Sequence, residues 1–128
     1  MSYNFIFVFL GGGLGCTLRY AIQMIMKAYL PTMNFPIPIF TINVLGCFLI
    51  GFFYALSDHF GLSDNTRILL TTGLCGGFTT FSTFSDECLG LIKQGYWVEF
   101  SGYVVLSVLL GICAVFAGGF IGQHINKA

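Results

Sequence analysis

The middle of the chain reads Gly-Leu-Cys-Gly-Gly-Phe-Thr-Thr-Phe-Ser-Thr-Phe-Ser over residues 73–85. Five hydroxyl side chains occur among residues 79–85, just after the glycine pair Gly76-Gly77. Glycine and β-branched threonine both weaken a helix, so we predict a helix that is broken near this glycine pair. Backbone carbonyls that are freed by such a break need other hydrogen-bond partners.

The composition around this stretch is that of a membrane protein. Of 128 residues, 56% are hydrophobic and only 8% are charged, and the mean hydropathy is +0.88. A soluble domain carries about 25% charged residues, so this chain could not cover a water-facing surface. The same numbers exclude a disordered chain. Five basic residues against five acidic ones also exclude a nucleic-acid-binding surface, which needs clustered positive charge.

Charges and turn residues divide the chain into membrane spans. A bilayer core about 30 Å thick is crossed by roughly 20 apolar residues in a helix. Three prolines between residues 31 and 38 end the first span, and polar runs at residues 57–65 and 93–97 separate the others. We therefore predict an all-α membrane protein with a single transmembrane domain over residues 1–128. Its four spans are expected at about 4–26, 37–57, 67–92 and 98–122.

The basic residues give almost no preferred orientation. With four spans, Lys27 and Lys93 lie on one side and Arg67 and Lys127 on the other, which is a tie under the positive-inside rule. A short chain with few charges can give such a tie, but it also permits dual topology, with copies inserted both ways. We predict dual topology and an antiparallel homodimer, because four helices alone can hardly enclose a pathway. No basic residue precedes Arg19, so we do not expect a cleaved signal peptide.

Small residues indicate where the helices meet, because helices associate in lipid through close backbone contact. Gly11 and Gly15 form a GxxxG pair in the first span. The second span offers Gly46 and Gly51, and in the fourth span three glycines share one helix face. These are Gly111, Gly118 and Gly122.

The hydroxyl cluster in the third span predicts a site for a small anion. One or two hydroxyls could bond to their own helix carbonyls, but five among seven residues indicate a functional site. Phe81 and Phe84 share a helix face and offer ring edges, the positive part of the aromatic quadrupole. With the amide of Asn43, these neutral donors could replace the water of an anion without trapping it. Tyr103 and Ser107 form either a second polar track or an interfacial tyrosine beside an internally bonded serine.

Three motifs resemble the CrcB/Fluc fluoride channel family, and the resemblance extends over essentially the whole chain. They are residues 11–15 with Arg19-Tyr20, residues 41–48 with the sequence Thr-Ile-Asn-Val-Leu-Gly-Cys-Phe, and the highly specific residues 73–85. The resemblance implies a fluoride-selective channel of the cytoplasmic (inner) membrane that lets fluoride leave the cell passively. It also implies an antiparallel, dual-topology homodimer with two pores along the subunit interface.

The resemblance further implies which residues serve the pores. One group lines each pore or lies beside it, and a second holds a structural Na⁺ at the dimer axis through backbone carbonyls from both subunits. The Na⁺ ligands implied are the carbonyls of Gly76 and Thr79. The pore and fluoride-binding residues implied are Asn43, Thr80, Phe81, Ser82, Thr83, Phe84, Tyr103 and Ser107.

Other functions explain less of the sequence. A small proton-coupled multidrug exporter would share the size and span number, but it needs a membrane-embedded carboxylate, and the first span carries Arg19 and no acidic residue. An accessory subunit that only packs against other helices would explain the glycines but not the hydroxyls. The five cysteines show no metal-ligand spacing and are expected to be buried small hydrophobes. No nucleophile and base are paired in the sequence, so we do not expect an enzyme.

Overall fold

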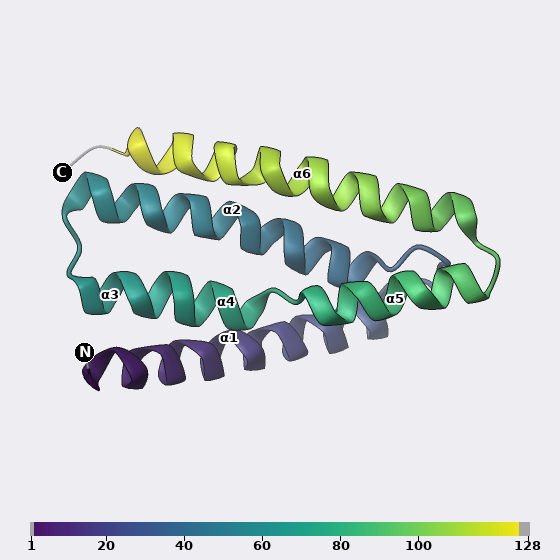
Figure 1. Ribbon diagram of the computed structural model, residues 1–128, viewed down its shortest axis with the longest axis horizontal. Helices are drawn as coiled ribbons and strands as arrows, with labels where there is room; N and C mark the ends of the chain where they lie inside the picture. The colour runs from purple at the N-terminus through teal and green to yellow at the C-terminus, as the bar shows by residue number, and fades with distance from the viewer. Residues whose placement is uncertain (1, 126–128) are drawn as a thin grey trace.

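The computed structural model describes residues 2–125, which form helices and no strand. The four segments between α2 and α6 follow one another almost in line, so the chain forms four rods that run back and forth (Figure 1). In chain order the elements are α1 (Ser2–Tyr29), α2 (Ile37–Phe60), α3 (Asp64–Ile68), the π-helix η1 (Leu69–Cys75), α4 (Gly76–Phe78), α5 (Phe81–Lys93) and α6 (Trp97–Gln123).

The predicted all-α membrane fold with four rods is confirmed. By length and composition, three helices can cross a membrane, at Tyr3–Tyr29, Ile37–Phe60 and Trp97–Gln123. The third rod in chain order, residues 64–93, is divided by a break, so none of its pieces is long enough to cross a membrane by itself. The spans expected at 4–26, 37–57, 67–92 and 98–122 all fall within the four rods, and α1 begins at the end of the molecule where α6 ends (Figure 1).

The turn between α2 and α3 follows from its residues. Gly61 ends α2 in a left-handed conformation with φ 63°, and its N–H donates to the carbonyl of Ser57. Glycine adopts this conformation without a side-chain clash. Ser63 then caps α3, because its side chain accepts a hydrogen bond of 3.3 Å from the N–H of Thr66. The polar run predicted as a turn therefore contains a helix stop followed by a helix start.

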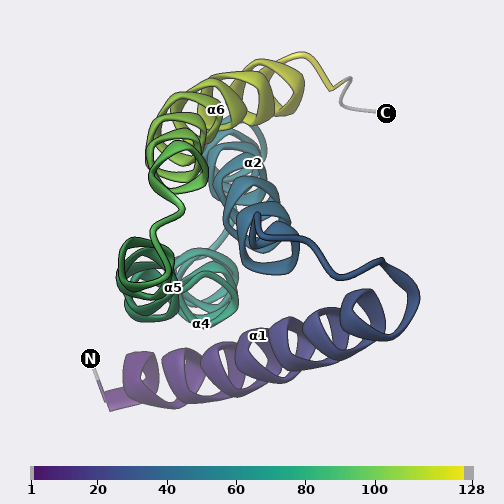
Figure 2. The ribbon, with the colours of Figure 1, turned by 90° about the vertical axis from the view of Figure 1, so that its right-hand side faces the viewer.

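Glycines bring the rods into backbone contact, as predicted. A Cβ atom added to Gly11 would lie 2.5 Å from the carbonyl oxygen of Leu69, so α1 packs directly on η1. A Cβ on Gly118 would clash with the carbonyl of Phe48, so α6 packs equally closely on α2. Figure 2 shows α6 beside α2, and α1 passing next to α4, which continues η1.

The helix break lies at Thr79 and Thr80, just after the glycine pair that we expected to interrupt the helix. Gly76 and Gly77 are helical, whereas Thr79 (φ −84°, ψ 160°) and Thr80 (φ −151°, ψ 115°) are extended. Gly77 stays helical because it packs against α1, where an added Cβ would lie 2.5 Å from the carbonyl oxygen of Gly12. Thr80 is extended because it is the N-cap of α5.

The prediction that the cysteines are buried was wrong for two of them. Cys75 and Cys88 are buried, but Cys16 and Cys113 are exposed on α1 and α6. The outer faces of these helices are predominantly apolar, as expected for a surface whose solvent is lipid. A small apolar thiol is as acceptable there as in a protein core.

Candidate functional site

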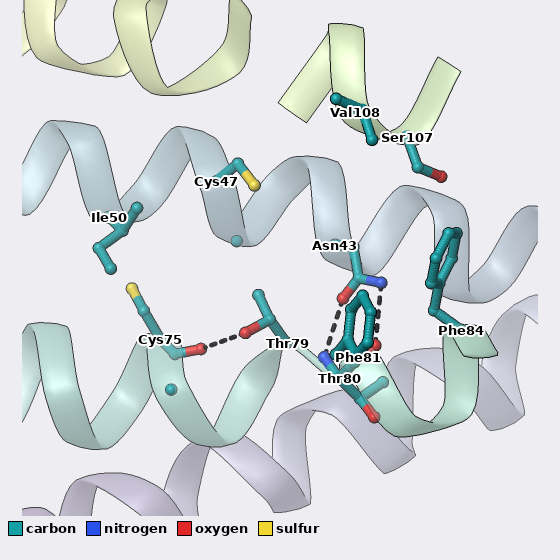
Figure 3. Close-up of a pocket in the computed structure, with 12 residues that line it drawn as sticks. Asn43, Cys47, Ile50, Cys75, Thr79, Thr80, Phe81, Phe84, Ser107 and Val108 are labelled. Atoms are coloured by element: carbon teal, nitrogen blue, oxygen red, sulfur yellow. Dashed lines mark hydrogen bonds between the residues drawn. The ribbon is translucent and has the colours of Figure 1, made fainter. Parts of the chain in front are cut away.

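A groove lies beside the break, where α2, the junction of η1 and α4, the start of α5 and α6 come together (Figure 3). Its volume is about 350 Å³. Within residues 2–125, none of its lining residues carries a charge. The lining residues are Asn43, Gly46, Cys47, Ile50, Cys75, Gly76, Thr79, Thr80, Phe81, Phe84, Ser107 and Val108.

Asn43 bonds to the backbone at the break. Its Oδ1 accepts a hydrogen bond of 2.9 Å from the N–H of Thr80, and its Nδ2 donates one of 3.1 Å to the carbonyl of Thr80. Figure 3 shows this pair of bonds as two parallel dashed lines. The extended Thr80 has no helical partners, so the side-chain amide takes their place. The Asn43 amide has a second N–H, which has no partner within residues 2–125 and can donate to a solute in the groove.

The clustered hydroxyls mainly organise the break. Thr80 Oγ1 accepts from the N–H of Thr83 at 3.2 Å, donates to Thr83 Oγ1 at 3.1 Å, and lies 3.3 Å from Ser82 Oγ. Thr79 Oγ1 donates to the carbonyl of Cys75 at 3.0 Å. Thr79 and Thr80 line the groove, whereas Ser82 and Thr83 are not among its lining residues.

Phe81 and Phe84 both line the groove and lie next to each other, as their spacing predicted. Their ring centroids are 5.7 Å apart and their planes meet at 39°. Phe81 is 78% exposed, whereas Phe84 is half-buried with its ring 4.8 Å from that of Tyr103. Phe84 is therefore held by packing, while Phe81 is largely exposed and has the Phe84 ring beside it.

The structure separates the two members of the predicted second track. Ser107 lines the groove, and its hydroxyl oxygen is buried without a hydrogen-bond partner in the described part of the chain. Tyr103 is fully buried, lies outside the groove lining, and donates from its hydroxyl to Glu87 Oε1 at 2.8 Å. Sequence reasoning gave Glu87 no partner, because nothing local in the chain indicates that α5 and α6 place these two residues together.

A second cavity, of about 360 Å³, lies at the end of the molecule where α1 leads into the loop before α2. Lys27 and Glu87 contribute to its lining, so it is more strongly charged than the groove. Asp86, the neighbour of Glu87 in the chain, is not part of the lining. Glu87 therefore lines this cavity and also accepts the hydrogen bond from the buried Tyr103 hydroxyl.

Comparison with known proteins identifies the family. A family model described as "CrcB-like protein, Camphor Resistance (CrcB)" matches residues 6–119. The chain belongs to the CrcB family. Curated relatives named "Fluoride-specific ion channel FluC" include one from Bacteroides fragilis, 47% identical over 93% of this chain and 95% of the relative. The relative from Phocaeicola vulgatus is 47% identical over 94% and 98%, and that from Leptospira interrogans is 44% identical over 91% and 92%.

Family membership and the apolar helices make the chain a multi-pass protein of the inner membrane. The names of the relatives describe ion channels and not enzymes. The family motif quoted from residues 73–85 now has a structural meaning, because it contains the end of α4, the break and the start of α5. In this CrcB protein the motif builds one wall of the groove, and Asn43 on α2 joins the opposite wall to it.

Proposed function

We propose that this CrcB-family protein is a fluoride-selective channel that lets fluoride leave the cytoplasm down its gradient. The observation that carries the proposal is an uncharged groove at the middle of a broken membrane helix, with Asn43, Ser107 and the two phenylalanines on its walls. The relatives named as fluoride-specific channels, which match almost the whole chain, support the same function.

The groove suits a small, strongly hydrated anion. The amide of Asn43 and the unpartnered hydroxyl of Ser107 can donate hydrogen bonds that replace water, and phenylalanine ring edges add weak positive poles. Neutral donors bind an anion without holding it as tightly as a lysine would, and conduction requires release as well as binding. The groove lining contains no carboxylate, so it offers nothing on which a proton-coupled exporter of cationic drugs could work.

The channel is proposed to work as an antiparallel, dual-topology homodimer. One chain supplies walls from α2, α5 and α6 but leaves Phe81 78% exposed at the groove edge. An anion passing through lipid needs a closed wall, and a second copy turned the other way would supply it. The equal numbers of basic residues on the two membrane sides support insertion in both directions.

A structural Na⁺ at the dimer axis is part of the proposal. Gly76 and Thr79 both line the groove, and the side of Gly76 where a Cβ would stand has only the carbonyl oxygen of Thr71 nearby, at 3.9 Å. Hard cations bind oxygen ligands, and backbone carbonyls at broken membrane helices can hold Na⁺. One chain offers too few such carbonyls, so the site needs both copies. The bound ion would supply a positive charge that favours a nearby anion.

Reconstitution in liposomes tests the proposal directly. Vesicles loaded with fluoride should release it when the protein is present, as recorded with a fluoride electrode, whereas vesicles without protein should retain it. Vesicles loaded with chloride should show no comparable release. Replacing Na⁺ by a large organic cation on both sides should lower the fluoride rate. Absence of fluoride efflux, or equal passage of chloride, would contradict the proposed function.

A further inference from the structure

Arg19 is a charged residue inside the first membrane-spanning helix. It lies in α1, about 5 Å from the midpoint of the helix at roughly 1.5 Å per residue, and its side chain is half-buried. A charge at such depth is costly, so it is expected to have a partner or a task. The groove does not explain its presence, because Arg19 is not one of the lining residues.

The partner of Arg19 is a carbonyl that the helix break has released. Arg19 Nε donates to the carbonyl of Gly77, at 3.3 Å. In an unbroken helix this carbonyl would accept from the N–H of residue 81, but the extended Thr79 and Thr80 remove that donor. The guanidinium also lies at the C-terminal end of the first half of the rod, where the helix dipole is negative. The hydrogen bond and the dipole therefore both favour a cation at this place.

The packing of α1 holds Arg19 in position. Gly11, Gly15 and Arg19 follow one another at intervals of four residues and so share one face of α1. An added Cβ on Gly15 would lie 2.9 Å from the backbone nitrogen of Phe78, so the helix backbones touch one turn before Arg19. This contact fixes the distance between Arg19 and the end of α4.

We propose that Arg19 is a positioning residue that fixes the end of the first half of the broken span. Asn43 on α2 holds Thr80 within the break, and Arg19 on α1 holds Gly77 just before the break. The two attachments, from different helices, determine where Thr79 and Thr80 cross between the half-helices, and hence the shape of the groove. For its effect on ion flux, this inference rests on the proposed channel function.

The test compares variants at Arg19 that separate charge from hydrogen bonding. Arg19→Met removes both, Arg19→Gln keeps an N–H donor without charge, and Arg19→Lys keeps charge and donor. Arg67→Met is the matched control, because Arg67 lies at the far end of the rod with its guanidinium 5.1 Å from the Tyr54 ring centroid. Hydrogen–deuterium exchange of the peptide that covers the break reports on the backbone without requiring transport.

We expect Arg19→Met to raise exchange at residues 79–83 about tenfold, since a bond to a charged group is lost, whereas Arg67→Met leaves exchange there unchanged. Arg19→Gln should lie between Arg19→Met and wild type, and Arg19→Lys should stay near wild type. In liposomes, the maximal fluoride rate of Arg19→Met should fall about tenfold while the half-saturating fluoride concentration changes little.

Two results would overturn the inference. The first is found in Arg19→Met, if hydrogen exchange at the break is unchanged and the half-saturating fluoride concentration is raised. That result would mean that Arg19 attracts anions and does not position the backbone. The second, which applies even if Arg19→Met does not fold, is equal exchange in Arg19→Gln, Arg19→Lys and wild type. If the wild-type protein carried no fluoride, the proposed function would fail, while the exchange measurements would still test the attachment of Gly77.

Discussion

Asn43 serves both the fold and the proposed channel. Its amide satisfies the N–H and the carbonyl of Thr80 and keeps one N–H for a solute in the groove. A hydrophobic residue could fill the same volume but would leave two backbone groups unpaired at membrane depth. A single asparagine therefore both stabilises the helix break and supplies a hydrogen-bond donor to the groove.

Replacing Asn43 should reduce fluoride transport strongly. Asn43→Ala leaves the backbone of Thr80 without its partners and removes the free donor, so we expect the efflux rate to fall at least about tenfold. Asn4→Ala is the control, because Asn4 lines a cavity at the other end of the molecule. Liposome efflux and size-exclusion chromatography measure the outcome. Normal efflux from Asn43→Ala would show that the amide is not needed.

Phe81 offers a second prediction at this scale. It is 78% exposed in one chain, so Phe81→Ile should change the stability of the single chain little and yet suppress fluoride efflux, because isoleucine lacks the positive ring edge. Phe116→Ile is the matched control, since Phe116 is 75% exposed on α6 and is not part of the groove lining. Equal efflux from the two variants would remove Phe81 from the pathway.

At the scale of the elements, the broken rod depends on its neighbours. The π-helix η1 and α4 pack on α1 through Gly11, Gly15 and Gly77. After the break, α5 begins and packs on α6. A second close contact is the one between α2 and α6, where Gly118 brings the backbones together. The groove lies between these two contacts, so its shape depends on both.

Adding a methyl group at the contact between α2 and α6 should destabilise the protein. A Cβ on Gly118 would clash with the carbonyl of Phe48, so we expect Gly118→Ala to lower the free energy of unfolding by about 1–3 kcal/mol. Gly102→Ala on the same helix is the control, because an added Cβ there meets nothing within 4 Å. Thermal unfolding in detergent measures both. Equal midpoints for the two variants would contradict the close packing of α2 on α6.

At the scale of the whole molecule, one chain presents an incomplete pathway. Its groove is uncharged and open at the edge where Phe81 stands, and its outer helix faces are apolar. Lipid can cover apolar faces, but it cannot solvate an anion in the groove. This is the physical reason for proposing a second copy, and the small number of charges permits that copy to insert in the opposite direction.

Dual topology predicts a definite labelling pattern. Lys27 and Arg67 lie near opposite ends of the rods, so Lys27→Cys and Arg67→Cys should each react about half with a membrane-impermeant maleimide added outside intact cells. The remaining half should react after the membrane is opened. Unsubstituted protein controls for the native cysteines. Complete labelling of one position and none of the other would show a single orientation. Lys127, which also entered the charge count, lies outside the described residues.

Much of this architecture could be predicted from local chemistry. Low charge and high hydropathy require lipid as solvent, the positions of charges and prolines set four spans, and the hydroxyls and phenylalanines of residues 73–85 indicated the site. These features depend on residues close together in the chain, where hydropathy and helix periodicity are informative. The predicted all-α architecture was confirmed for this reason.

The remaining features arise from how helices that are distant in sequence face one another. The break lies at Thr79 and Thr80 because Gly77 packs against α1 as part of a helix, and the Asn43 amide forms hydrogen bonds with the N–H and the carbonyl of Thr80. Tyr103 meets Glu87 instead of the groove, although Ser107, one turn later, lines it. Such pairings depend on the rotation and depth of each helix, which packing in three dimensions sets and which no local pattern records.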